Sequence, residues 1–164
     1  MTAKSRHDAL QTVEREIGVM MRRIRKVTGV RARMIDPHLQ AASYLMLGHL
    51  VQYGPMRSSS LAEVFNIDKG AISRQVQHLV DLGLVVRTPD PEDGRATLVE
   101  ATEDAARRVR AVAAERLEWW DERLGEWSDE ELAGFADVLT RYNAILSEPQ
   151  EPGSTPHGPG AGPA

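Results

Sequence analysis

The sequence predicts a mainly α-helical fold that carries one small β-hairpin. Apolar residues recur at intervals of three and four over most of the chain, as they do along helices with one buried face. Two short β-prone runs, 84–88 and 96–100, flank a turn that contains Pro-Asp-Pro and Asp-Gly. The last seventeen residues, 148–164, contain five Pro and four Gly, so they are predicted to form a disordered tail outside any core.

Composition narrows the class of protein. The 164 residues are 41% hydrophobic and 27% charged, which is typical of a soluble globular protein. The absence of cysteine excludes a disulfide scaffold, a thiolate metal site and a cysteine nucleophile. The five histidines are scattered, with no carboxylate at ligand spacing, so neither a metal nor another cofactor is expected. No apolar run approaches the ~20 residues of a membrane span, and we expect a cytoplasmic protein with no membrane partner.

Charge is distributed unevenly along the chain. The net charge is −4, which taken alone argues against nucleic acid as a partner. Residues 4–33 hold nine basic and three acidic groups (+6), and residues 100–164 hold fourteen acids and six arginines (−8). The segment between them holds five basic groups and seven acids (−2), so any anion that it binds must be held by a few well-placed cations.

The N-terminal segment, 1–35, is predicted to be one amphipathic helix. Its apolar stripe consists of Leu10, Val13, Ile17, Met20, Met21, Ile24 and Val27. The favoured interpretation is that the rest of the protein covers this stripe; a membrane surface or a partner helix is the alternative. Asp36 and Pro37 are then expected to cap a second helix, which ends at Gly54-Pro55.

Two further helices and a short turn are predicted before the hairpin. Ser60 and Glu63 have the spacing of a capping box, and Asn66-Ile67-Asp68 interrupts the helical pattern. Asp68 caps the next helix, 69–82, which is stopped by Gly83 and has Ile72, Val76, Leu79 and Val80 on its buried face. Over 36–101, this order of elements is that of a winged helix-turn-helix.

The exposed face of helix 69–82 has the chemistry of a helix that reads the major groove of double-stranded DNA. Arg74 is suited to a bidentate contact with guanine, and Gln77 to one with adenine. Lys69 and Ser73 are suited to phosphate or base contacts near the helix N-terminus, and Gly70 permits close approach of the backbone.

The hairpin turn strengthens the DNA interpretation. Arg95 lies at the end of the turn, where an arginine can enter a narrow minor groove. Asp93 is placed to pair with Arg95 or with another arginine and so to hold the turn.

The C-terminal segment, 102–147, predicts two helices built to meet other helices. Thr102 caps the first, and Ser128 with Glu131 forms a capping box for the second. Three tryptophans and a heptad-like seam exceed what a small reading head can cover, which favours a second copy as the partner. The predicted dimerisation residues of 1–35 and 102–147 are Val13, Ile17, Met20, Ile24, Leu117, Trp120, Leu124, Leu139, Tyr142 and Leu146.

Several motifs together resemble the MarR family of transcriptional regulators. They are Leu61-Ala62-Glu63, Asp68-Lys69-Gly70-Ala71-Ile72-Ser73-Arg74, Leu82-Gly83-Leu84-Val85 and Pro89-Asp90-Pro91-Glu92-Asp93-Gly94-Arg95. The resemblance covers about residues 10–147, and it departs where 101–105 reads Ala-Thr-Glu-Asp-Ala instead of Leu-Thr-x-x-Gly.

The resemblance implies a homodimer, usually a repressor, on a pseudo-palindromic operator, with Arg95 probing the minor groove. In many members a small phenolic or anionic effector releases the DNA. The candidate DNA-binding residues are Ser59, Ser60, Asp68, Lys69, Gly70, Ser73, Arg74, Gln77, His78, Asp93 and Arg95.

Two other classes of function compete with a DNA-binding regulator. An enzyme is not expected, because the sequence contains no glycine-rich phosphate loop, nucleophile elbow or paired acid–base motif. A winged-helix protein-interaction module without specific DNA binding stays open, since the fold alone does not distinguish it.

Overall fold

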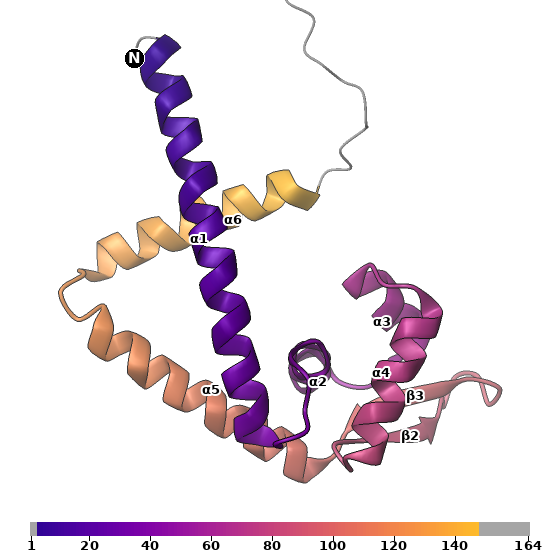
Figure 1. Cartoon of the computed structure of the whole chain (residues 1–164). Coiled ribbons are helices and arrows are strands. Elements are labelled where there is room, and N and C mark those ends of the chain that lie inside the picture. The colour runs from indigo at the N-terminus through magenta and orange to yellow at the C-terminus, as the bar shows by residue number, and fades with distance from the viewer. Residues whose placement is uncertain (1–2, 148–164) are drawn as a thin grey trace, which may run out of the picture. The chain divides into compact units, whose positions relative to one another are not determined.

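The structure is a computed structural model that describes residues 3–147 (Figure 1). In chain order its elements are α1 (Ala3–Ile35), α2 (Ala41–Tyr53), β1 (Met56–Arg57), α3 (Ser58–Phe65), α4 (Lys69–Asp81), β2 (Val85–Pro89), β3 (Thr97–Ala101), α5 (Glu103–Arg123) and α6 (Asp129–Ser147). The predicted fold class, mainly α with a small β wing, is confirmed. The predicted tail, 148–164, lies outside the described residues. The chain forms two compact units, which meet between Glu118 and Trp119 in the sequence.

The core of the first unit is formed by α2, α3, α4 and the sheet. Fully buried side chains include Met46 and Leu47 of α2, Leu61 of α3 and Ile72 of α4. The C-terminal part of α1 and the first half of α5 complete this core with Ala32, Ile35, Ala105, Val109 and Val112. Because these residues are spaced at helical intervals, each helix is fixed to the core by one face.

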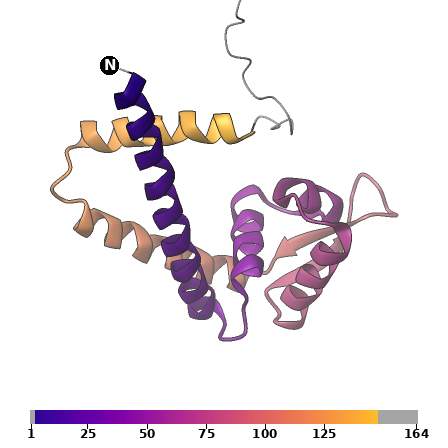
Figure 2. The ribbon, with the colours of Figure 1, turned by 45° about the horizontal axis from the view of Figure 1, so that its top comes forward.

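The sheet has three antiparallel strands in the order β1-β3-β2. The predicted hairpin is present, with Val85 opposite Ala101 and Pro89 opposite Thr97. The prediction of only two strands is wrong, because Met56 and Arg57 pair with β3. A strand of two residues is too short to show the alternation that identifies strands in a sequence. The loop between β2 and β3 stands away from the helices of this unit (Figure 2).

Two predicted helix starts are displaced. α3 begins at Ser58, not at the predicted Ser60 cap, because the pairing of β1 with β3 brings Arg57 into the extended cap conformation. α2 begins at Ala41 with Gln40 as its N-cap residue. Asp36 instead closes the turn after α1, where its Oδ1 accepts a hydrogen bond of 2.8 Å from the backbone N–H of His38.

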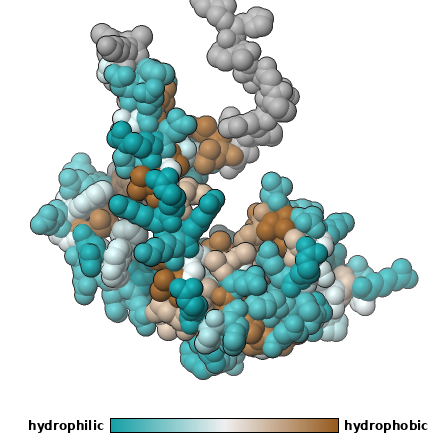
Figure 3. All heavy atoms as spheres, in the orientation of Figure 1, coloured by the Kyte–Doolittle hydropathy of each residue, from teal (hydrophilic) through white to brown (hydrophobic). Residues whose placement is uncertain are grey.

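The apolar stripe of α1 is not covered in the single chain, contrary to the favoured interpretation of the sequence. Thr28, Ala32 and Ile35 are buried, but most of the stripe before them is exposed. Apolar atoms accordingly reach the surface among the polar side chains of α1 (Figure 3). The exposed members are Leu10, Val13, Met20, Met21, Ile24 and Val27.

The second unit consists of the end of α5, the turn after it and α6. The predicted capping box is confirmed, since the backbone N–H of Ser128 donates to Glu131 Oε2 at 2.8 Å and the N–H of Glu131 donates to Ser128 Oγ at 3.3 Å. Trp127 packs edge-on against Phe135 with ring centroids 5.8 Å apart, and Arg123 lies over the ring of Trp119. All three tryptophans nevertheless remain more than two-fifths exposed, so this unit does not bury its own aromatic side chains.

None of the helices within residues 3–147 is long and apolar enough to cross a membrane. Over the same residues, no group of three or more His, Asp or Glu side chains is placed to hold a metal ion.

Candidate nucleic-acid interface

A sharp turn sets α3 and α4 at the surface of the first unit. Asn66 adopts the left-handed conformation (φ 48°, ψ 50°), which asparagine tolerates better than most residues, and this ends α3. Asp68 then caps α4, as predicted, because its Oδ1 accepts a hydrogen bond of 2.9 Å from the backbone N–H of Ala71. Ile72, Val76 and Leu79 are fully buried, so the opposite face of α4 faces outward.

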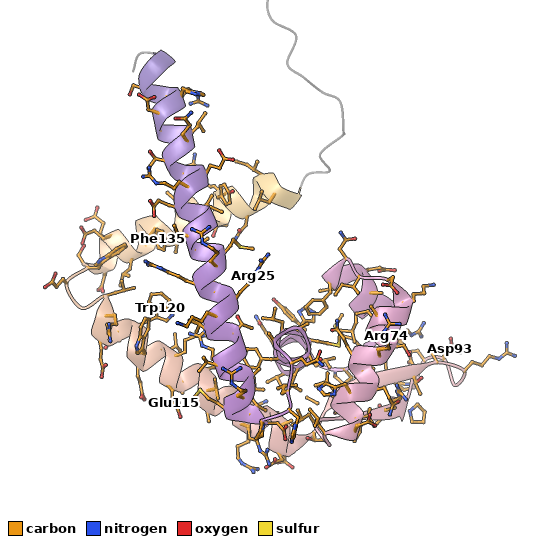
Figure 4. All side chains as sticks on the ribbon, viewed as in Figure 1. Arg25, Arg74, Asp93, Glu115, Trp120 and Phe135 are labelled. Atoms are coloured by element: carbon orange, nitrogen blue, oxygen red, sulfur yellow. The ribbon has the colours of Figure 1, made fainter. Side chains whose placement is uncertain are left out.

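Three predicted DNA-binding residues, Lys69, Ser73 and Arg74, are exposed on this outward part of α4. Figure 4 shows Arg74 on α4. Within residues 3–147, neither Lys69 nor Arg74 forms a hydrogen bond or an ion pair through its side chain. Their cationic groups are therefore available to an anionic partner.

Gly70 lies between the cap and the predicted base reader. A Cβ atom at this position would lie 3.1 Å from Asp68 Oδ1 and 3.5 Å from an Nη atom of Arg74. The sequence suggested that Gly70 permits a close approach of DNA. In the structure, the missing side chain also leaves room for the Asp68 cap.

Gln77 and His78 differ from Arg74, because both already have partners. Gln77 Oε1 accepts a hydrogen bond from Arg87 of β2 at 3.1 Å, and its Nε2 donates to Asp81 at 2.8 Å. The Nε2 of His78 lies 3.2 Å from the carbonyl oxygen of His38, in the turn before α2. Contact of Gln77 with a base would require both of its hydrogen bonds to be exchanged.

The predicted serines of α3 have different surroundings. Ser59 is exposed and lines a shallow hollow with Asp68, Lys69 and neighbouring residues of α3 and the turn. Ser60 is half-buried in the first turn of α3. The hollow therefore brings together Ser59, Asp68 and Lys69 from both helices of the helix-turn-helix.

The wing carries the other two predicted residues. Asp93 Oδ1 accepts a hydrogen bond of 3.1 Å from the backbone N–H of Arg95. The side chain of Arg95 is exposed and has no partner within residues 3–147. As expected from the sequence, Asp93 also approaches an arginine, but this is Arg57, with 4.0 Å between Nη2 and Oδ2.

Sequence reasoning missed the ion pair at the base of the wing. Arg57 Nε donates to Asp90 Oδ2 at 2.6 Å, and the Asp90 side chain is only 6% exposed. The bond to Asp90 raises the pKa of Arg57. The backbone N–H of Glu92 and the Arg57 guanidinium hold the pKa of Asp90 below its usual value. The two residues are 33 positions apart, and the short strand that brings them together gave no sequence signal.

The predicted dimerisation residues form exposed apolar surface in both units. Val13 and Ile24 of α1, Leu117 and Trp120 of α5 and Leu146 of α6 are all more than two-fifths exposed, and Met20 is 36% exposed. The remaining four are half-buried, namely Ile17, Leu124, Leu139 and Tyr142.

This geometry defines a class: a winged helix-turn-helix protein whose α4 and wing present the unpaired cations Lys69, Arg74 and Arg95. The MarR family model matches residues 39–96. The chain is 38% identical over 106 residues to the uncharacterized HTH-type transcriptional regulator YxaD of Bacillus subtilis (strain 168). These residues make up 65% of this chain and 74% of that relative. The chain belongs to the MarR family and is an HTH-type transcriptional regulator, not an enzyme.

Two further similar proteins have a role or a ligand in their names. One is the HTH-type transcriptional repressor NicR of Pseudomonas putida, 28% identical over 102 residues, or 61% of this chain and 65% of that relative. The other is the structure of a putative MarR family regulator from Listeria monocytogenes complexed with 26mer DNA. It superposes with a TM-score of 0.66 at 17% identity and covers 80% of this chain and 87% of that chain, so it shows the shared fold.

Proposed function

We propose that this chain is a homodimeric repressor that binds a pseudo-palindromic operator in the cytoplasm and is released by a small anionic effector. The observation that carries the DNA part is the set of unpaired cations on α4 and the wing, Lys69, Arg74 and Arg95. In this proposal α4 enters the major groove and Arg95 the adjacent minor groove. Ser59, Ser60, Asp68, Gly70 and Ser73 line the approach, while Gln77, His78 and Asp93 act mainly by holding neighbouring groups in place.

The exposed apolar surfaces of α1, α5 and α6 support a second copy as the partner. Exposed apolar side chains in such numbers are rare on proteins that remain monomers. The proposed division by role is therefore 1–35 and 102–147 for dimerisation and 36–101 for reading DNA. The DNA complex of the Listeria relative and the repressor name of NicR support the operator and the repressor role.

The effector part is supported by two arginines whose charges repel each other, Arg31 on α1 and Arg116 on α5. Burial and the nearby Arg116 guanidinium lower the pKa of Arg31, whereas Tyr44 of α2 raises it. In the part of the chain that the structure describes, neither arginine forms an ion pair with a carboxylate. Two neighbouring cations without a counterion favour an anion, and the Tyr44 hydroxyl adds a hydrogen-bonding group for a phenol or carboxylate.

Selection of duplexes by the purified protein from a random-sequence pool tests the DNA part. We expect an enriched pseudo-palindrome, on which Arg74→Ala and Arg95→Ala each lose about 1–3 kcal/mol of binding free energy. For Arg74→Ala the loss should fall on one base pair of each half-site and be smaller on unrelated DNA. Arg107→Ala on α5 serves as the control and should bind like the wild type. If no sequence is enriched, the chain is an interaction module and the proposal fails.

Titration of the preformed DNA complex with benzoate, a simple aromatic anion, tests the effector part. Release should occur with the wild type and be lost in Arg31→Met and Arg116→Met. Equal sensitivity of all three proteins to benzoate would place the effector elsewhere and contradict the site.

A further inference from the structure

Arg57 joins the start of the helix-turn-helix to the wing. It is the last residue of β1 and the N-cap residue of α3, so its backbone is fixed by the sheet on one side and by a helix on the other. Its side chain crosses to the wing, where Nε lies 2.6 Å from Asp90 Oδ2 and Nη2 lies 4.0 Å from Asp93 Oδ2. The Arg57 side chain therefore contacts both Asp90 and Asp93. Each of these carboxylates also accepts a hydrogen bond from a backbone N–H of the wing loop.

Those two carboxylates also shape the loop that carries Arg95. Asp90 Oδ1 accepts a hydrogen bond of 2.9 Å from the backbone N–H of Glu92, and Asp93 Oδ1 accepts one of 3.1 Å from the N–H of Arg95. A backbone hydrogen bond from the N–H of Asp90 to the carbonyl oxygen of Ala96, at 3.0 Å, closes the base of the same loop. A shift of either carboxylate would therefore move the backbone from which the Arg95 side chain extends.

The pairing of Arg57 with Asp90 differs from an ordinary surface ion pair in the burial of its carboxylate. The Asp90 side chain is almost fully buried, whereas Arg57 is 41% exposed. A buried carboxylate needs partners for its oxygens, and those of Asp90 are the backbone N–H groups of Glu92 and Asp93 and the Arg57 guanidinium, its one charged partner within residues 3–147. Removal of Arg57 would take away the charged partner of a buried anion, and the loop would rearrange to bring the carboxylate to water.

We propose that Arg57 is a positioning residue for Arg95: it fixes the wing loop to the base of α3, so that Arg95 meets DNA at a set place relative to α4. This inference rests on the proposed function, in which Arg95 contacts DNA. An ordered loop lowers the entropic cost that the wing would otherwise pay on binding. Arg57 itself makes no contact with a base in this proposal.

A double-mutant cycle tests whether Arg57 acts through Arg95. The measured quantity is the Kd for a duplex that the wild-type protein has selected from a random pool. Arg57→Gln should raise the Kd about three- to tenfold, the effect of ordering roughly one side chain on binding. In the Arg95→Ala background the same change should alter the Kd less than about twofold, because the group that Arg57 positions is absent.

Asp90→Asn provides a second variant of the same contact. The amide oxygen of asparagine can still accept the Glu92 N–H, but the ion pair with Arg57 is lost. Asp90→Asn should therefore reproduce the effect of Arg57→Gln, with no further loss when the two are combined. If Arg57→Gln fails to fold, Asp90→Asn replaces it in the double-mutant cycle with Arg95→Ala. Arg107→Gln, which breaks an exposed ion pair with Asp104 on α5, is the control and should leave the Kd unchanged.

Hydrogen exchange of the free protein tests the positioning role without DNA. In Arg57→Gln the backbone amides of Arg95 and Ala96 should exchange about tenfold faster, whereas those of Ile72 and Val76 in α4 should not change. This readout separates the inference from the proposed function. If Arg95→Ala binds DNA like the wild type, the proposed role of the wing fails, but the exchange rates still decide whether Arg57 holds the loop.

Two results would overturn the inference. An equal loss of affinity for Arg57→Gln in the wild-type and Arg95→Ala backgrounds would show that Arg57 acts independently of Arg95. If that loss also lowered the salt dependence of binding by about one counterion, Arg57 would be a direct phosphate contact. Unchanged exchange at Arg95 and Ala96 would show that the loop is held by its own hydrogen bonds alone.

Discussion

Individual side chains on α4 and the wing differ in whether their polar groups are free. Arg74 and Arg95 keep unpaired guanidinium groups, whereas the amide of Gln77 is held by Arg87 and Asp81. Helical spacing places Arg74 and Gln77 on one face and assigns both to base contacts. It cannot show that a side chain from β2, ten positions later, reaches Gln77. The chemistry of α4 was thus predictable from its sequence, but the partners of its side chains were not.

Asp90 should make the stability of the first unit depend on pH. Its pKa is held below the usual value, first by the Glu92 N–H and then by Arg57, so the folded protein favours the ionised form. A group whose pKa is lower in the folded state stabilises the folded protein fully at pH values above its unfolded pKa, here about 3.9. This stabilisation is lost as the pH falls through the folded pKa.

Asp90→Asn should therefore lower the free energy of unfolding at pH 7 and at pH 5, and the difference from wild type should shrink at pH 3. Urea unfolding of both proteins at the three pH values measures this difference in the free energy of unfolding. Asp121→Asn, on the exposed side of α5, is the control and should differ little from wild type at any of them. A deficit of Asp90→Asn that stays the same at pH 3 would mean that its ionisation does not contribute.

Elements marked by capping residues and glycine were predictable from the sequence. Asp68, Thr102 and Ser128 all cap helices where the pattern placed them, because a capping side chain and its backbone partner are only three residues apart. β1 and the start of α3 were not predictable, because strand pairing over more than 40 residues determines both. The contact of Arg57 with the wing depends on that pairing and was missed for the same reason.

The cap of α4 should contribute measurably to the stability of this element. Asp68→Ala removes the acceptor for the Ala71 N–H, and we expect a loss of about 1 kcal/mol in the free energy of unfolding. Asp68→Asn keeps an acceptor oxygen in the same place and should remain close to wild type. Chemical denaturation of the three proteins measures the difference. Equal stability of all three would mean that Asp68 does not stabilise α4 as a cap.

At the scale of the whole molecule, the net charge of −4 does not describe the reading head. Three unpaired cations, Lys69, Arg74 and Arg95, lie on α4 and the wing, and the acidic excess lies in 100–164. The apolar residues are also unevenly distributed. Those of α2, α3 and α4 mostly form a buried core, whereas many of those on α1, α5 and α6 are exposed. The sequence periodicity identified these residues but could not show whether the same chain covers them, because that depends on packing between distant helices.

Ile24→Asp should disrupt the proposed dimer without affecting the core. Ile24 is 50% exposed in the single chain, so an aspartate there is tolerated in a monomer. In a dimer the aspartate replaces a buried isoleucine in each of the two copies. We expect this to weaken the association free energy by about 3–6 kcal/mol. Sedimentation equilibrium measures the change. Val64→Asp on α3 is a matched control, 51% exposed and outside the proposed interface, and should remain dimeric. A wild-type monomer, or an Ile24→Asp dimer of unchanged affinity, would contradict the interface.

The central claim, that two reading heads bind one operator, is tested most directly by changing the distance between half-sites. Insertion of five base pairs at the centre of the selected pseudo-palindrome turns one half-site by about half a helical turn relative to the other. We expect the wild-type protein then to lose most of its specific affinity and to bind the inserted duplex no better than an isolated half-site. Unchanged affinity for the inserted duplex would contradict the claim, because each head would then read DNA independently of the other.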